Sequence, residues 1–242
     1  MKPVKKFLDD LKQEFEPLYQ VSEIQTRAYF GSKPSKESLL EHFKIRMMNE
    51  RGNMIELSKK VANLPPTTKP EEARLLAKQA FDEAEHFRMV CEVVEHVSGK
   101  EVDLEGIHAT HGKPRADQGV SIIGRYNAQK DPMALALYQY LAEGRASRVW
   151  QTMADCVQDD FVASRYGKIA RDERFHSEIG RMKLEELCVS AEAQARVKEL
   201  AKQWYWDLYE VACLSNCEPT EEAKAIMKEA YGQPTRELKV AI

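Results

Sequence analysis

Apolar residues recur at intervals of three and four along most of this 242-residue chain, which is the spacing that places them on one face of an α-helix. The pattern predicts a first helix over residues 4–29 and a second over residues 35–63. Pro65 and Pro66 must end the second helix, because proline cannot donate the hydrogen bond that a further turn needs. A third helix is predicted from a capping box at Thr68–Glu71 to residue 98.

The helical pattern is interrupted over residues 100–130, a segment that is long for a connection within a compact domain. Asp131-Pro132 then marks a helix start, with Asp as the cap and Pro in the first turn. A short break at residues 158–160 separates this helix from the next, and two more helices are predicted over residues 190–214 and 220–231. We therefore predict an all-α fold: a four-helix bundle with one long crossover, an N-terminal covering helix and C-terminal helices.

Four glutamates fall on the apolar faces of the four central helices, one on each helix. A carboxylate in such a place would be buried at a large cost in free energy unless it is protonated or bound to a cation. In a helical hairpin, residues equally distant from the loop lie at one height, because both helices rise 1.5 Å per residue. Glu50 and Glu83 lie 17 and 16 residues from the centre of their loop, and Glu143 and Glu173 lie 16 and 14 residues from theirs. Each pair should therefore be level.

A repeated motif joins two of these glutamates to histidines. The pattern Asp-Glu-x-x-His occurs at residues 82–86 and again at residues 172–176. A Glu and a His three residues apart lie on one face of a helix and can reach one metal ion. The alternative to a metal site is a bundle in which the buried Glu and His residues merely pair with arginines. Two such motifs with one further Glu each match the ligand set of a di-iron or di-manganese carboxylate bundle. The predicted metal ligands are Glu50, Glu83, His86, Glu143, Glu173 and His176.

The composition limits the partners and the compartment. A formal net charge of -3 gives no reason to expect a nucleic-acid partner. No apolar run reaches the length of a membrane span, so we expect a soluble protein without a membrane partner. The five cysteines include no C-x-x-C pair, which argues against a disulfide framework, a zinc knuckle or a rubredoxin-type iron site. The expected location is the cytoplasm.

These motifs resemble the ferritin-like non-haem di-iron carboxylate oxygenase superfamily, over about residues 36–188. Residues 74–84 and 170–176 are locally most similar to the phenylacetyl-CoA epoxidase type. The resemblance implies a single ferritin-like helical domain over residues 1–242 that holds two Fe ions, or Mn in their place, and uses O2 as co-substrate. The aromatic amine N-oxygenases of the superfamily have a histidine one turn before the last Glu; Ile169 stands there in this chain, which argues against that branch.

The resemblance also implies an activity, that of a monooxygenase which hydroxylates, epoxidises or similarly oxidises a small organic substrate. The substrate is expected near Met47, Tyr140, Gly144 and Ser147, with Tyr140 as a catalytic residue. No flavin, NAD or Fe–S motif occurs in the chain, so an external electron donor, a reductase or a ferredoxin, is expected. A homodimer is compatible with the sequence. Two alternatives stay open: a ferritin-type iron-handling protein with ferroxidase activity, and a non-catalytic scaffold subunit.

The two aspartates of the motifs, Asp82 and Asp172, are predicted as catalytic residues that assist the histidines. Histidines that bind metals usually donate their second ring N–H to a carboxylate or carbonyl group. Related di-iron enzymes pair these groups crosswise, so the resemblance implies a bond between Asp82 and His176 and another between Asp172 and His86. The alternative is that either aspartate simply pairs with a neighbouring arginine on its own helix.

Overall fold

The computed structural model describes residues 2–112, 130–213, 219–234 and 237–238. Every regular element in these ranges is a helix, and no strand occurs within them. The predicted all-α class is therefore confirmed. None of the described helices is long and apolar enough to cross a lipid bilayer. Most of the crossover predicted over residues 100–130 lies outside the described residues.

The chain divides into two compact units. We call residues 34–125 the hairpin unit, and residues 1–33 together with 126–242 the larger unit. Each unit is described by itself. The prediction of a single domain over residues 1–242, with a bundle core at about 36–188, combines helices from both units and stays a prediction.

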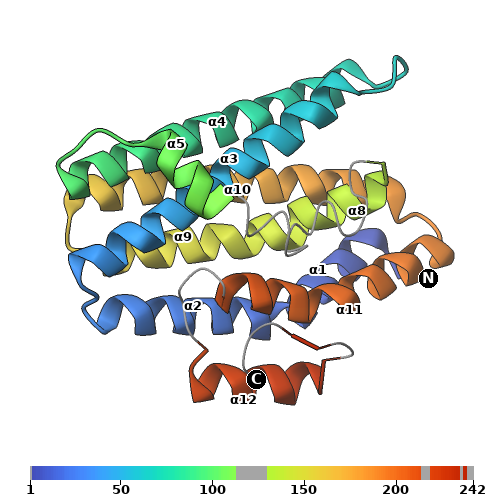
Figure 1. Ribbon diagram of the computed structural model, residues 1–242. Coiled ribbons are helices and arrows are strands. Elements are labelled where there is room, and N and C mark those ends of the chain that lie inside the picture. Colours follow the sequence, from blue (N-terminus) through green and yellow to red (C-terminus); the bar gives the residue numbers. More distant parts are fainter. Residues whose placement is uncertain (1, 113–129, 214–218, 235–236, 239–242) are drawn as a thin grey trace. The chain divides into compact units, whose positions relative to one another are not determined.

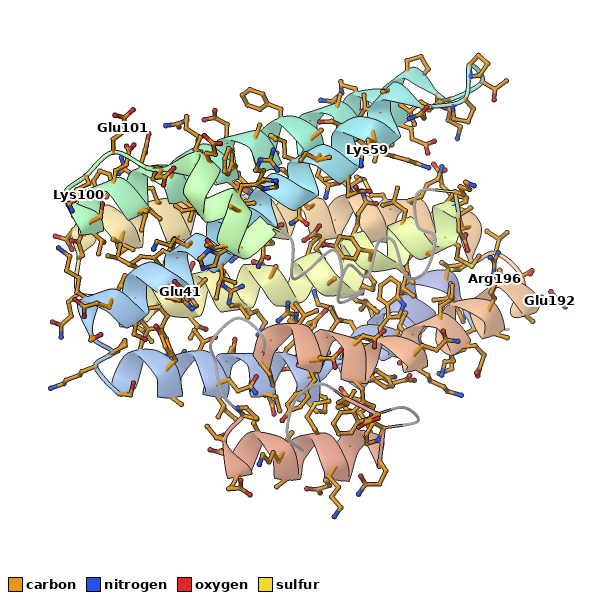
Figure 2. The ribbon with its side chains drawn as sticks, in the orientation of Figure 1. Glu41, Lys59, Lys100, Glu101, Glu192 and Arg196 are labelled. Carbon is orange, nitrogen blue, oxygen red and sulfur yellow. The ribbon has the colours of Figure 1, made fainter. Side chains whose placement is uncertain are left out.

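The hairpin unit is built on two long helices, α3 (Lys36–Ala62) and α4 (Pro70–Ser98), which pack against each other and run antiparallel (Figure 1). The short helix α5 (Leu104–Ile107) and the π-helix η1 (His108–Gly112) follow. Ser35 caps α3 by accepting a hydrogen bond from the Ser38 amide. Charged side chains such as Lys59 and Lys100 lie at the surface of this unit (Figure 2).

The start of α4 corrects one prediction, because the Thr68–Glu71 capping box does not form. The residue before the helix is Lys69, which makes no side-chain capping bond, and Pro70 occupies the first turn. Proline can begin the helix without a side-chain cap because its fixed φ already suits a helix and it has no amide N–H to satisfy. Two glutamates in the first turn also favour this end through the helix dipole.

The larger unit contains the remaining helices. The helix predicted over residues 4–29 is two helices, α1 (Val4–Glu14) and α2 (Glu16–Gly31). The chain breaks at Phe15 because Pro17, in the first turn of α2, has no N–H to continue the helix from α1. The elements described farther along this unit are α8 (Pro132–Leu137), η2 (Tyr138–Glu143), α9 (Gly144–Cys156), α10 (Asp160–Leu187), α11 (Ala191–Cys213) and α12 (Glu221–Tyr231). The π-helix η2 joins α8 to α9.

The core of the larger unit forms where α10 packs along α8, η2 and α9, and where α2 packs on α9, α11 and α12. The predicted cap at Asp131 is confirmed, since its carboxylate accepts a hydrogen bond from the Met133 amide at 3.0 Å. Trp150 and Tyr166 are both buried and meet edge to face, with ring centroids 4.9 Å apart. This contact fixes α9 against α10.

Candidate metal centre

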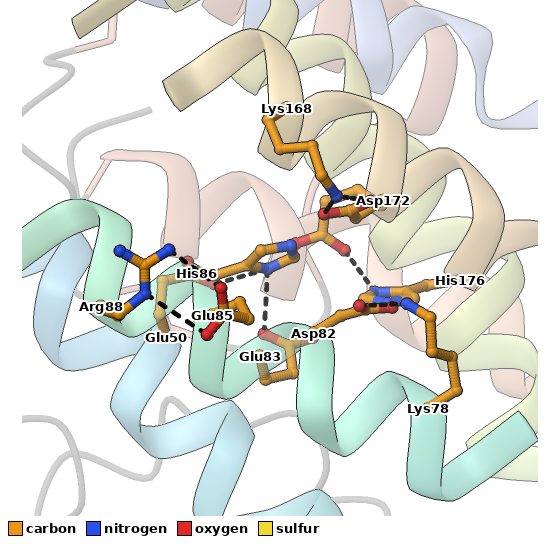
Figure 3. A network of polar contacts seen from close by, with 11 residues as sticks. Glu50, Lys78, Asp82, Glu83, Glu85, His86, Arg88, Lys168, Asp172 and His176 are labelled. Atoms are coloured by element: carbon orange, nitrogen blue, oxygen red, sulfur yellow. Dashed lines mark hydrogen bonds and ion pairs between the residues drawn. The ribbon is translucent and has the colours of Figure 1, made fainter. Parts of the chain in front are cut away.

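The hairpin unit brings three of the predicted ligands together. Glu50 comes from α3, and Glu83 and His86 come from neighbouring turns of α4. All three side chains are buried. Nδ1 of His86 lies 3.5 Å from Oε2 of Glu50 and 3.5 Å from Oε2 of Glu83 (Figure 3). Each residue offers a ligand atom within 4.8 Å of the others, so this cluster could hold a metal ion.

The electrostatics of this cluster suit a cation. Burial raises the pKa of Glu50 above its ordinary value; the nearby Glu83 carboxylate adds to the rise, and His86 opposes it. Two buried carboxylates that face each other are costly to ionise without a positive charge between them. A bound metal ion would supply that charge and favour the ionised form of both groups. The residues present therefore fit a metal ion.

The larger unit brings together the other three predicted ligands. Glu143 is the last residue of η2, and Glu173 and His176 lie one turn apart on α10. All three are buried. Nδ1 of His176 lies 3.0 Å from Oε2 of Glu173, and each of the three residues offers a ligand atom within 4.8 Å of the others. Each unit thus contains a buried cluster of two Glu and one His that could bind metal.

Two other glutamates next to these clusters do not join them. Glu85 pairs with Arg88 at 2.9 Å (Figure 3), and Glu178 pairs with Arg181 at 2.9 Å. Both pairs lie within one helix turn and are partly exposed. A solvated ion pair of this kind contributes little to stability. Glu85 and Glu178 are therefore suitable control positions for the buried glutamates.

Each motif aspartate pairs with a lysine four residues earlier on its own helix. Lys78 contacts Asp82 on α4, and Lys168 contacts Asp172 on α10 (Figure 3). Sequence reasoning missed these lysines, although they stand at the same offset in both copies and extend the repeat to Lys-x-x-x-Asp-Glu-x-x-His. The crosswise bonds from the aspartates to the histidines would each require residues of both units, and they stay a prediction, as does a catalytic role for Asp82 and Asp172.

The π-helix η2 sets the position of Glu143. A π-turn replaces the usual hydrogen-bond pattern by bonds between residues five apart and often marks a functional site. Hydroxyl groups from two other helices bond to its carbonyls: Ser177 on α10 donates to the Tyr140 carbonyl at 2.7 Å, and Tyr19 on α2 donates to the Leu141 carbonyl at 3.0 Å. These bonds hold the turn that ends at Glu143. The apolar spacing alone predicted an ordinary α-helix here.

Gly180 lets α10 approach this turn closely. A Cβ atom at position 180 would lie 2.4 Å from the Tyr140 amide nitrogen and 2.5 Å from the Ala136 carbonyl oxygen, both far inside van der Waals contact. Gly144, beside which the sequence predicted the substrate, faces side-chain hydroxyl groups rather than backbone atoms. A Cβ there would lie 3.0 Å from the Tyr19 hydroxyl and 3.1 Å from the Ser177 hydroxyl. The space beside Gly144 is therefore lined by these two hydroxyl groups.

The hydroxyl groups predicted near the substrate are bonded to the backbone. Tyr140 is buried and donates to the Leu8 carbonyl at 3.1 Å, and Ser147 donates to the Ala170 carbonyl at 2.8 Å. Burial raises the pKa of Tyr140, and Asp9 adds to the rise, so the phenol keeps its proton at neutral pH. The catalytic role of Tyr140 stays a prediction, and the structure gives it a role in fixing η2 to α1.

Ser177→Ala should destabilise the protein by about 1–2 kcal/mol, because the Tyr140 carbonyl loses the hydrogen bond that the Ser177 hydroxyl donates to it. Ser164→Ala is the matched control: Ser164 is exposed on the same helix, donates to a carbonyl of its own turn and accepts a hydrogen bond from the neighbouring Arg165. The loss of these exposed hydrogen bonds should change stability little. Urea denaturation followed by circular dichroism measures both. Equal effects of the two substitutions would contradict the role of Ser177.

No protein-family model, no curated protein and no solved structure matches this chain. The assignment of a function therefore depends on the residues and on their geometry within each unit.

Proposed function

We propose that the two buried clusters together hold a pair of iron ions, or manganese in their place, and that the protein is a non-haem di-iron oxygenase. One observation carries this proposal. One sequence motif occurs once in each unit of the chain. In each unit the Glu and the His of the motif form a buried cluster with one further glutamate, Glu50 or Glu143. Four Glu and two His are the ligand set of the di-metal carboxylate bundle.

The proposal requires a ferritin-like arrangement in which α3, α4, α10 and the helix formed by η2 and α9 each contribute one Glu. In that arrangement Glu50, Glu83 and His86 would hold one ion, and Glu143, Glu173 and His176 would hold the other. Oxygen-rich ligands with imidazole suit iron and manganese. The aspartates would orient the ligand histidines through their second ring nitrogens.

Iron bound in this way would supply the redox chemistry needed to activate O2 for the oxidation of a small organic substrate. The chain's own residues would hold the ions, keep bulk water from them through burial, and fix the ligand orientation through the π-turn. Electrons would come from a separate reductase or ferredoxin. A scaffold subunit would have no need of all six ligands, and all six are present.

Aerobic addition of Fe(II) to the metal-free protein tests the metal site and separates the enzyme from a storage protein. We expect iron binding to saturate at about two ions per chain, the number that this ligand set holds. Metal content after desalting and the absorbance of oxidised iron measure the result. Continued uptake of iron far beyond this number would contradict the oxygenase proposal and favour ferritin-type iron handling.

Oxygen transfer itself requires a second experiment. The iron-loaded protein, with a chemical reductant and an artificial electron carrier, is incubated under 18O2 with a mixture of small organic molecules. An oxygenase should produce compounds that carry the heavy isotope, detected by mass spectrometry, and the Glu83→Ala variant treated in the same way should not. Stable binding of two irons without labelled products would favour the non-catalytic scaffold.

A further inference from the structure

The larger unit contains a polar cleft between α2, α9 and α10. Its volume is about 460 Å³, within the range of small-molecule sites. The floor is formed by Tyr19, Gly144, Ser147, Thr152 and Ser177. Three of these side chains carry hydroxyl groups that already donate to backbone carbonyls. Their oxygen atoms can still accept hydrogen bonds, so the floor suits a ligand that carries hydroxyl groups of its own.

Three cationic side chains that have no carboxylate partner among the described residues line this cleft. Lys12, Arg27 and Arg174 line it, and in the part of the chain that the structure describes none of the three forms an ion pair with Asp or Glu. The ammonium group of Lys12 lies 5.8 Å from the centre of the Tyr140 ring. Three cations that come from α1, α2 and α10 can therefore all turn toward an occupant of the cleft.

The acidic residues of the cleft are engaged with other groups. The carboxylate of Glu23 pairs with Arg148 at 2.6 Å, and Glu178 pairs with Arg181. Asp155 accepts a hydrogen bond from Gln151 at 2.9 Å. The ion pairs of Glu23 and Glu178 reduce the repulsion that these two carboxylates exert on an anion. The three cations keep their full capacity to bind one.

We propose that this cleft binds a small organic anion that carries at least two negative charges, as carboxylate or phosphate groups, together with hydroxyl groups. Arg27 and Arg174 hold the anionic groups, Lys12 adds a third positive charge, and the hydroxyl oxygens of the floor accept hydrogen bonds from the ligand. Arginine is well suited to this role because its planar guanidinium donates two parallel hydrogen bonds to carboxylate or phosphate.

The cleft lies beside the backbone of three candidate metal ligands. Gly144, Arg174 and Ser177 line it, and each directly follows a candidate ligand in the chain, namely Glu143, Glu173 or His176. An occupant would therefore contact the helices that position these ligands. The binding proposal depends only on the charges and shape of the cleft, and it does not require a metal ion.

Isothermal titration calorimetry tests the proposal at low ionic strength, on the full chain as purified and after removal of metal with a chelator. The probes are glucose 6-phosphate, which carries phosphate and hydroxyl groups, malate, which carries two carboxylates and a hydroxyl, and neutral glucose. We expect saturable binding of at least one anion, with or without metal, and none of glucose. The anion that binds more tightly identifies the preferred charged group.

Matched variants locate the binding. Arg27→Gln combined with Arg174→Gln should weaken anion binding roughly tenfold or more, because two charge-assisted hydrogen bonds are lost. Arg171→Gln removes the same charge from an exposed position of α10 outside the cleft. This variant should bind within about twofold of the unchanged protein, because Arg171 does not line the cleft and water weakens the effect of its charge at a distance. Circular dichroism checks that all variants stay folded. The proposal is overturned if neither anion binds, if glucose binds equally well, or if the double variant binds like the Arg171 variant.

Discussion

Glu83→Ala and Glu173→Ala should each leave the purified protein with clearly less than two metal ions per chain. Each substitution removes a buried anionic side chain that we propose as a metal ligand. Changes in residues that only support metal ligands already cost 10–100-fold in affinity, so loss of a ligand should cost at least about 100-fold. Metal analysis after dialysis against a weak chelator, together with Fe(II) titration, measures the effect.

Glu85→Ala and Glu178→Ala are the controls for these two variants. Each removes a glutamate from the same helix, α4 or α10, but from a solvated ion pair rather than a buried cluster. Both controls should keep the metal content of the unchanged protein. The metal-free Glu83→Ala protein should also stay folded, since it no longer buries that carboxylate. Full metal retention by either ligand variant would show that the residue is not a ligand.

Gly180→Ala should be among the most destabilising single substitutions in the larger unit, at about 3 kcal/mol. The added methyl group would overlap the Tyr140 amide nitrogen and the Ala136 carbonyl oxygen. Both are backbone atoms of packed helices and cannot rotate aside as a side chain could. Either α10 must move away from η2 or the π-turn must distort. Chemical denaturation gives the loss of stability, and iron titration shows whether the position of Glu143 is affected.

Gly167→Ala, on the same helix, should raise the stability of the protein instead of lowering it. A Cβ at position 167 meets only the flexible end of Arg171, at 3.7 Å. Alanine is the better helix former, because glycine loses more backbone freedom on folding, so this substitution should stabilise the protein by about 0.5–1 kcal/mol. If both glycine variants changed stability by the same amount and in the same direction, close packing at Gly180 would not be the cause.

The sequence was sufficient for features that depend on local spacing. Apolar periodicity predicted the bounds of α3, α4 and α11 within one or two residues, and the cap at Asp131 predicted the start of α8. The burial of Glu50 and Glu143 could be predicted because each carboxylate interrupts an otherwise apolar face. The Glu-x-x-His spacing brought each histidine next to its glutamate, as the distance of 3.0 Å between His176 and Glu173 shows.

Features that depend on contacts between helices could not be predicted in this way. The π-turn at residues 138–143 is held by hydroxyl groups from α2 and α10, and periodicity within one helix contains no information about these donors. The spacing within α10 does not distinguish Gly180 from other helix residues, because its role depends on the backbone of α8 and η2. The break at Phe15 was missed because apolar spacing continues across it, even though Pro17 was a visible signal.

The π-turn at residues 138–143 also bears on the origin of the helical segment formed by α8, η2 and α9. A turn of this kind contains one residue more than an α-helix needs to cover the same length, so α8 and α9 are out of step with each other by about one position. Substitutions alone would not readily produce such a step, whereas the insertion of a single codon would. A relative without the π-turn should therefore align with this chain only when a one-residue gap is opened within residues 138–143, and deletion of one residue there is the smallest mutation expected to restore a continuous α-helix.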